Sequence, residues 1–202
     1  VMSYNRLAVQ TQRGCPWDCE FCASTVRMSP RYRVKPVAKV IEEIRRIRSL
    51  WPHPFIEFAD DNTFVAKEHS KRLLRALARE DIRYFTETDV SVADDEDLLA
   101  LLQDSGCAQV LIGFESSART ALEGLELRSD WKARQVDRYA AAIERIQSRG
   151  VSVNGCFVLG LDGSGPEVFD EVRAFVRSSG LHDVQITIQT AFPGTPLYAR
   201  LA

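Results

Sequence analysis

The chain has 202 residues, of which 45% are hydrophobic and 27% charged, a composition typical of a soluble globular protein with a sizeable core. Its formal net charge of −2, with both signs interspersed, excludes a global field that would draw it to nucleic acid or to an anionic membrane. No apolar run approaches the roughly 18 residues of a membrane span, and no secretory signal opens the chain, so we expect a cytoplasmic location.

Short apolar segments with a high β propensity alternate with longer segments of helical periodicity along the chain. The expected strands are Leu7–Thr11, Phe55–Ala59, Tyr84–Glu87, Gln109–Phe114, Ser152–Leu159 and Val184–Gln189. The expected helices between them are Pro36–Leu50, Lys67–Glu80, Asp95–Asp104, Lys132–Arg149 and Pro166–Ser178. This alternation predicts an α/β fold with parallel strands.

Six strand–helix units fall short of the eight units and roughly 250 residues of a closed barrel. The pattern therefore fits either an open, three-quarter barrel or a doubly wound sheet. Both architectures place chemistry at the carboxyl ends of the strands. The chain opens on Val1 and stops at Ala202 as another helix begins, so we expect a segment of a longer protein.

Polar residues gather where the expected strands end. Asp60-Asp61-Asn62 follows the second strand, Glu87-Thr88-Asp89 ends the third and Glu115-Ser116 follows the fourth. A cysteine-rich segment follows the first strand at the same edge. We therefore expect one site at this edge of the sheet.

Five cysteines are present, and Cys15, Cys19 and Cys22 occupy one short segment with the spacing C-x3-C-x2-C. An odd number with three clustered favours a metal or redox site over a disulfide framework. Cys107 and Cys156 lie in apolar segments and are interpreted as free buried cysteines.

The three clustered cysteines fit zinc poorly, because a structural zinc site uses four protein ligands. His53, His69 and His182, the three histidines of the chain, do not stand at ligand spacing from the cluster. Iron–sulfur clusters are commonly held by four thiolates. A cubane held by three would leave one iron open to a small molecule.

The segment Gln12–Cys22 resembles the signature loop of the radical S-adenosylmethionine (SAM) enzymes, with an aromatic residue, Phe21, between the last two cysteines. The resemblance implies that Cys15, Cys19 and Cys22 hold a four-iron four-sulfur cluster whose open iron is chelated by SAM. An electron from the cluster would then break the sulfonium C–S bond and yield a 5′-deoxyadenosyl radical. It also implies that residues 1–202 are a radical SAM core domain, a partial (β/α)6 TIM-like barrel of parallel strands.

Residue by residue, the resemblance places Phe21 beside the adenine of SAM and Glu87 at the ribose hydroxyls. Asp60, Asp61 and Asn62 stand where the family usually carries a Gly-Gly-Glu-like motif that receives the SAM amino group. Which of the three does so is left open by the sequence. Helix capping is the competing interpretation of Asn62.

Later segments extend the expected SAM site. Glu115 and Ser116 correspond to a polar position facing SAM, and Arg128 to a basic residue that clamps the methionyl carboxylate. A surface charge is the competing interpretation of Arg128. Val158 and Gly160 belong to a segment that resembles the family strand lining the adenine.

Five segments resemble the radical SAM cores that often follow a cobalamin-binding domain: Arg13–Cys15, Pro30–Arg33, Phe58–Asn62, Ile112–Ser116 and Phe192–Tyr198. Members of this branch are frequently methyltransferases, and some catalyse cyclisations or other rearrangements. The cobalamin signature Asp-x-His-x-x-Gly is absent from these 202 residues. If cobalamin is a further cofactor, its domain lies outside this chain, upstream of Val1, or has been lost.

The leading hypothesis is an enzyme that cleaves SAM reductively to drive radical modification or methylation of an unidentified small molecule, with flavodoxin or ferredoxin as electron donor. A second hypothesis is a tRNA-modifying enzyme, in which the basic residues of Arg27–Lys39 would meet phosphate, although the net charge does not favour nucleic acid. A third is a non-catalytic iron–sulfur module.

Overall fold

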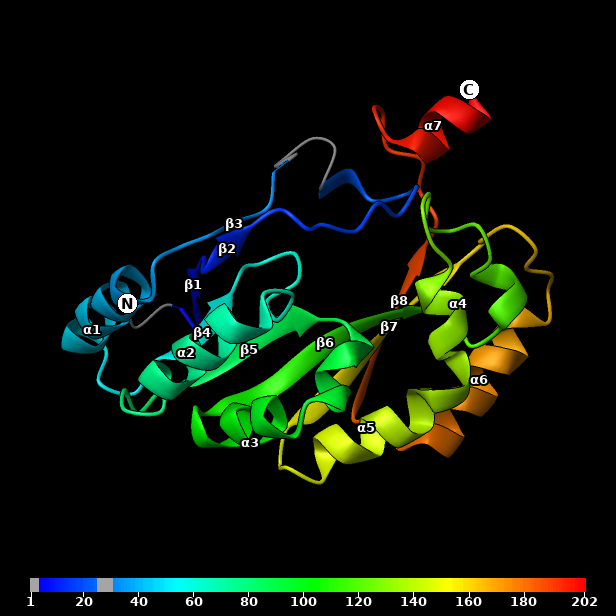
Figure 1. The fold of residues 1–202 in the computed structure, drawn as a ribbon. Helices are drawn as coiled ribbons and strands as arrows, with labels where there is room; N and C mark the ends of the chain where they lie inside the picture. Colours follow the sequence, from blue (N-terminus) through cyan, green and yellow to red (C-terminus); the bar gives the residue numbers. More distant parts are fainter. Residues whose placement is uncertain (1–3, 25–30) are drawn as a thin grey trace.

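The computed structural model describes residues 4–24 and 31–202. Its main sheet has six parallel strands in the order β1-β4-β5-β6-β7-β8, the order in which they follow along the chain (Figure 1). Their bounds are β1 Leu7–Val9, β4 Phe55–Phe58, β5 Arg83–Thr88, β6 Cys107–Glu115, β7 Ser152–Leu159 and β8 Asp183–Ile188. Each lies within two residues of the strand expected from the sequence.

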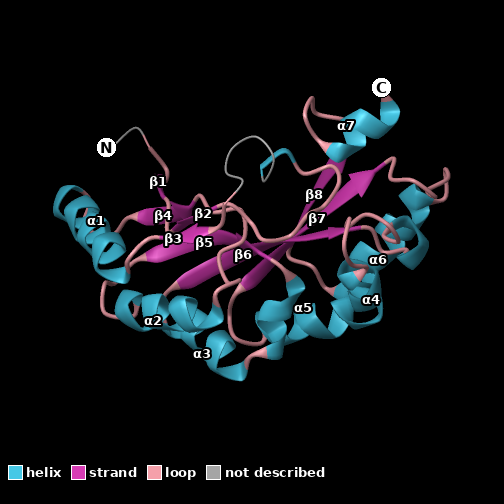
Figure 2. Ribbon diagram, turned by 45° about the horizontal axis from the view of Figure 1, so that its top comes forward, coloured by secondary structure: helices cyan, strands magenta, loops and turns pink. Residues whose placement is uncertain are grey.

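Helices cover one face of this sheet (Figure 2). They are α1 Val37–Leu50, α2 Lys67–Leu77, α3 Glu96–Asp104, α4 Trp131–Gln135, α5 Tyr139–Gln147 and α6 Val168–Ser179. Parallel strands joined by right-handed crossovers put each helix on the same face as long as the strand order does not reverse. A doubly wound sheet would reverse its order, so the structure confirms the partial barrel and excludes that alternative.

The core lies between the strands and these helices. In β7, Val153 and Phe157 are fully buried on the helix side, whereas the intervening Cys156 faces the other side. Phe114 of β6 packs against Phe157 and against Tyr139 of α5, with ring centroids 5.8 and 4.6 Å apart. The period of two along each strand thus separates packing residues from those of the opposite, helix-free face.

Two features differ from the sequence prediction. The expected helix Lys132–Arg149 is interrupted, because a 3-10 turn, Val136–Arg138, separates α4 from α5. Arg138 in this turn binds the carboxylate of Asp94, and the Tyr139 hydroxyl donates to the Phe114 carbonyl at 3.4 Å. These tertiary contacts override a continuous helical periodicity.

The second difference is a small antiparallel ribbon, β2 (Gln12–Arg13) with β3 (Arg33–Val34), which has no periodic signal because each strand has two residues. Short 3-10 helices occur at Val90–Asp94 and Arg119–Ala121, and α7 spans Pro196–Leu201. Across the described residues, no helix combines the length and apolar character that crossing a membrane requires.

Core packing predicts a clear contrast between two leucines. Leu74 of α2 is 1% exposed, whereas Leu50 of α1 is 70% exposed. Leu74→Ala should lower the free energy of unfolding by about 2–5 kcal/mol through lost burial and a cavity. Leu50→Ala is the matched control and should change it by less than about 0.5 kcal/mol. Urea denaturation measures both, and equal effects would contradict the packing described.

Candidate functional site

A cavity of about 270 Å³ lies at the carboxyl ends of the parallel strands. Its wall includes the three clustered cysteines, Cys15, Cys19 and Cys22, together with side chains that follow β4, β5 and β6. Segments far apart in sequence therefore meet at one place. This is the edge at which the sequence predicted a site.

The cysteines lie on the loop that follows β2. Gly14, directly before Cys15, has a φ of 79°, a left-handed conformation that glycine adopts without strain. All three thiols are free and half-buried. Burial raises the pKa of Cys15 to about 11 and that of Cys19 to about 12. A metal bound by Cys15 and Cys19 as thiolates would therefore displace their protons.

The donor set fits an iron–sulfur cluster. Three thiols from one loop line one cavity, and thiolates are the ligands such clusters use. Within residues 4–24 and 31–202, no group of three or more His, Cys, Asp or Glu side chains is arranged to hold a metal ion. A cluster does not need such a group, because each thiolate binds a different iron. Cys156 is free, as expected, but it is only half-buried and lines the cavity, which corrects its interpretation as a buried core cysteine. Burial, and then the charges of Glu115 and Glu87, raise its pKa to about 11.

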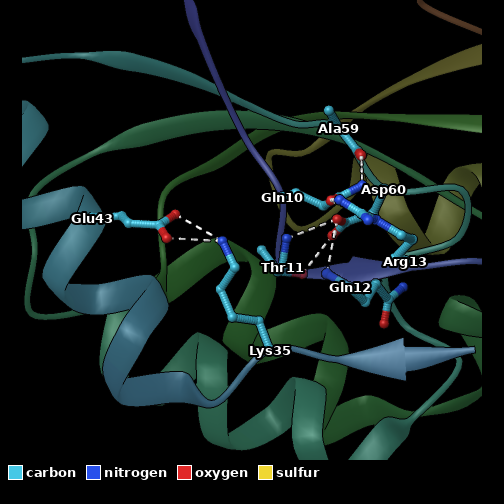
Figure 3. Close-up of polar contacts among 8 residues, drawn as sticks. All are labelled: Gln10, Thr11, Gln12, Arg13, Lys35, Glu43, Ala59 and Asp60. Carbon is cyan, nitrogen blue, oxygen red and sulfur yellow. Dashed lines mark hydrogen bonds and ion pairs between the residues drawn. The ribbon is translucent and has the colours of Figure 1, made fainter.

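Asp60 lies behind the cavity wall and is 3% exposed. Its carboxylate accepts from the backbone amides of Thr11 and Gln12 at 2.8 and 3.0 Å (Figure 3). It also accepts from the hydroxyls of Thr11 and Thr63 at 2.5 and 3.2 Å. Burial raises the pKa of Asp60. With its oxygens satisfied by these contacts, Asp60 joins the end of β4 to the segment that leads into the cysteine loop.

The next two residues line the cavity itself. Asp61 accepts from the backbone amide of Gly14 at 2.9 Å and from the hydroxyl of Ser24. The side-chain amide of Asn62 donates to Asp89 at 2.8 Å. Asn62 makes no helix cap, because the cap residue of α2 is Ala66.

Glu87 lies on the cavity wall, near the end of β5. Burial raises its pKa first, and the carboxylates of Asp61, Glu57 and Asp60 raise it further. Phe21 also lines the cavity, as the resemblance implies for a residue beside a purine. A concentration of carboxylates at this wall favours a cationic or hydroxyl-bearing ligand.

A buried ion pair completes the wall on the β6 side. Lys132 Nζ donates to Glu115 Oε1 at 2.8 Å and to the carbonyl of Gly113 at 2.7 Å. Burial opposes the charge of Lys132, but the nearby Glu115 outweighs it and raises the pKa of the ammonium. Glu115 has a φ of 63°, so β6 ends in a left-handed residue that turns its side chain towards Lys132. Glu126 also lines the cavity and accepts from the backbone amide of Lys132 at 2.8 Å.

Four further residues from the sequence prediction do not line the cavity: Ser116, Arg128, Val158 and Gly160. Ser116 is buried, and its hydroxyl accepts from the amide of Ala118 at 3.0 Å. The Arg128 side chain is 86% exposed and pairs with Asp18 at 2.9 Å.

Several residues that line the cavity were not predicted as site residues from the sequence. Two tryptophans, Trp17 and Trp131, stack with parallel rings whose centroids are 6.0 Å apart, and the indole of Trp17 donates to Asp89 at 3.3 Å. Asp89 belongs to the polar segment that ends the third expected strand, although it was not among the predicted site residues. Trp131 and Lys132 carried no signal, because they stand on a helix brought over the cavity by tertiary packing.

The comparisons with known proteins agree with this geometry. The model of the radical SAM superfamily matches residues 9–192. An uncharacterized methyltransferase of Synechocystis is 26% identical, over 98% of this chain and 38% of its own length. The hopanoid C-3 methylase of Methylococcus capsulatus is 29% identical, over 93% of this chain and 35% of its own. This chain thus spans less than half the length of these relatives.

Among solved structures, the radical SAM methyltransferase TsrM from Kitasatospora setae, with cobalamin and a [4Fe-4S] cluster bound, superposes with a TM-score of 0.83. The two sequences are 20% identical, and the match covers 98% of this chain and 39% of the TsrM chain. At this identity the likeness shows the fold alone. These matches confirm that the chain resembles the radical SAM cores of the cobalamin-associated branch.

The Glu115–Lys132 pair should be strongly coupled. Its side chains are 9% and 13% exposed, so Lys132→Met or Glu115→Gln leaves a buried group without its partner and should lower stability by about 3–5 kcal/mol. The double variant should lose less stability than the sum of the losses in the two single variants. The exposed pair Arg119–Asp137 is the control, with an expected coupling of about 0.2–1 kcal/mol. Equal coupling in the two double-mutant cycles would contradict this account.

Proposed function

Because this chain belongs to the radical SAM superfamily, we propose that residues 1–202 act as a radical SAM core domain that cleaves SAM reductively. The cleavage drives radical modification or methylation of a small-molecule substrate. The observation that carries the proposal is the meeting of Cys15, Cys19 and Cys22 on one cavity at the carboxyl edge of a partial barrel. Three thiolates on a four-iron four-sulfur cluster leave one iron for SAM.

The cluster, when bound, supplies the electron that breaks the sulfonium bond. The chain's own residues bind and orient SAM beside it. Phe21, Glu87 and Asn62 all line the cavity. We assign Phe21 to the adenine as a flat wall, Glu87 to the ribose hydroxyls as an acceptor, and Asn62 to the SAM amino group. Asp61 and Glu115 also line the cavity, whereas Asp60, Ser116, Val158 and Gly160 are not part of its lining.

The structure offers two cations for the methionyl carboxylate. Lys132 lines the cavity, held by Glu115 and by the carbonyl of Gly113. Arg128, which the resemblance assigns to this task, would have to leave Asp18 and turn inwards. Lys132 has the stronger support, because its ammonium is already at the wall.

Radical SAM enzymes need a reductant and a substrate, and we propose flavodoxin or ferredoxin as the electron donor and a cytoplasmic location. Methyl transfer is supported by the methyltransferases among the relatives. Cobalamin, if used, would be held by residues other than these 202, which lack its signature.

Nucleic acid is not favoured as a substrate. Of the basic residues that would meet phosphate, Arg27 lies outside the described residues, as does Pro30 of the branch motif. Lys35 pairs with Glu43 at 2.8 Å, as Figure 3 shows, which reduces the positive charge open to a phosphate.

Anaerobic reconstitution with iron and sulfide, followed by dithionite and SAM, should release 5′-deoxyadenosine or S-adenosylhomocysteine. Alanine at Cys15, Cys19 or Cys22 should abolish this release and lower the iron content, because one thiolate of the cluster is lost. Cys107→Ala is the matched control, since Cys107 is a buried thiol outside the cavity wall, and it should retain both. A fully loaded cluster that releases neither product would refute the activity.

Measurements of SAM affinity can distinguish whether Lys132 or Arg128 binds the methionyl carboxylate. In reconstituted protein, Lys132→Met should weaken SAM binding by roughly tenfold or more, the effect of losing a charge-assisted hydrogen bond. Arg128→Ala should change it by less than about twofold, because the side chain is exposed and outside the wall. Equilibrium dialysis with SAM measures both. The opposite order would restore Arg128 to the role implied by the resemblance.

A further inference from the structure

The loop that carries the three cysteines has two ends, and one carboxylate contacts both. Asp61 Oδ2 accepts from the backbone amide of Gly14, the residue before Cys15, at 2.9 Å. Asp61 Oδ1 accepts from the hydroxyl of Ser24, two residues after Cys22. We call residues 14–24 the cysteine loop. All three cysteines lie between the two contacts.

The middle of the cysteine loop is held by different partners. The amide of Glu20 donates to the carbonyl of Leu125 at 3.0 Å, and the amide of Leu127 donates to the carbonyl of Asp18 at 3.2 Å. The Arg200 guanidinium of α7 binds the Glu20 carboxylate with contacts of 2.7 and 3.1 Å. These contacts do not involve Asp61. Loss of Asp61 would therefore remove the contacts at Gly14 and Ser24 while those of the middle stay in place.

Asp61 is itself held by its neighbour. Asp60 is buried and accepts four hydrogen bonds from Thr11, Gln12 and Thr63. The backbone at the end of β4 is therefore fixed against the segment that enters the cysteine loop. A carboxylate on the next residue is then presented to both loop ends in one geometry.

We infer that Asp61 is a positioning residue that clasps the cysteine loop and thereby sets how firmly Cys15 and Cys22 hold the cluster. The inference rests on the proposed function, in which these cysteines are cluster ligands. It assigns Asp61 a task different from the one implied by the resemblance, which places it among the candidates for the SAM amino group. The three acidic and amide residues after β4 then divide their tasks: Asp60 anchors the backbone, Asp61 closes the loop, and Asn62 faces the ligand.

The two tasks predict different effects of the same substitutions. We call the two contacts of Asp61, with the Gly14 amide and the Ser24 hydroxyl, the clasp. Asp61→Ala removes both acceptor oxygens of the clasp. Asp61→Asn keeps them in part, because the amide oxygen accepts from Gly14 and the amide nitrogen donates to the Ser24 hydroxyl. A clasp therefore tolerates asparagine, whereas an acceptor for a positively charged amino group is weakened by it. Ser24→Ala removes one arm of the clasp.

The test is iron retention by the reconstituted chain. Iron and sulfide per chain, the visible absorbance of the cluster and the rate of iron release to a chelator are measured anaerobically. Asp61→Ala should release iron roughly tenfold faster than the wild type, since two hydrogen bonds are lost. The rate of iron release from Ser24→Ala should lie between those of Asp61→Ala and the wild type. The rate from Asp61→Asn should be close to that of the wild type. Circular dichroism checks folding, and Ser24→Ala provides the test if Asp61→Ala does not fold.

Asp95→Ala is the matched control. Asp95 also has two partners, the amide of Leu98 at 3.0 Å and the ammonium of Lys71 at 2.9 Å, but lies outside the cavity wall. Its loss should lower Tm without changing iron release. An equal effect on iron release in Asp95→Ala and Asp61→Ala would overturn the clasp, because general destabilisation would then explain both.

Two other outcomes overturn the clasp. One is an Asp61→Ala chain with wild-type iron retention and weakened SAM binding, which would favour the amino-group role. The other is an Asp61→Asn chain as poor in iron as Asp61→Ala, since charge rather than hydrogen bonding would then matter. A wild-type chain that takes up no iron overturns the clasp together with the proposed function. A wild-type chain that holds its cluster but cleaves no SAM refutes the activity alone, and iron retention still decides the clasp.

Discussion

Three thiols on one short loop can serve one cluster only if that loop is held in a single conformation. The constraint comes from hydrogen bonds to carboxylates that follow the neighbouring strand. Asp60 is buried and satisfied by Thr11, Gln12 and Thr63, and Asp61 contacts Gly14 and Ser24. A buried carboxylate without partners would be costly, so these contacts specify how the loop meets the sheet.

The parallel sheet explains why so many polar groups meet at this edge. Its strand order follows the chain without reversal, so the helices lie on one face and leave the other free. Residues after β4, β5 and β6 then surround the cysteine loop. The acidic wall that results is partly balanced by Lys132, whose ammonium is held by Glu115 and by a backbone carbonyl. The site thus combines several carboxylates with a buried cation without leaving that cation unpaired.

Much of the fold could be predicted, because it depends on local signals. A short apolar segment of high β propensity marked β7 to the residue, and helical periodicity marked α1 and α3 to within one residue. The break between α4 and α5 could not be predicted, since it is accompanied by contacts of Arg138 and Tyr139 with distant segments. Similarly, the spacing of the cysteines identified the loop, but the assignment of tasks to Asp60 and Asp61 required knowing which groups their oxygens contact.

The sequence by itself determined the parallel α/β architecture, the cysteine loop and the edge at which the site lies, because periodicity and spacing are properties of neighbouring residues. Only the tertiary structure decided which polar residues line the cavity. It placed Lys132 on the wall and left Arg128 at the surface, although the two are four residues apart. The physical reason is that burial and pairing depend on how helices pack across the strand ends, which no local pattern of residues records.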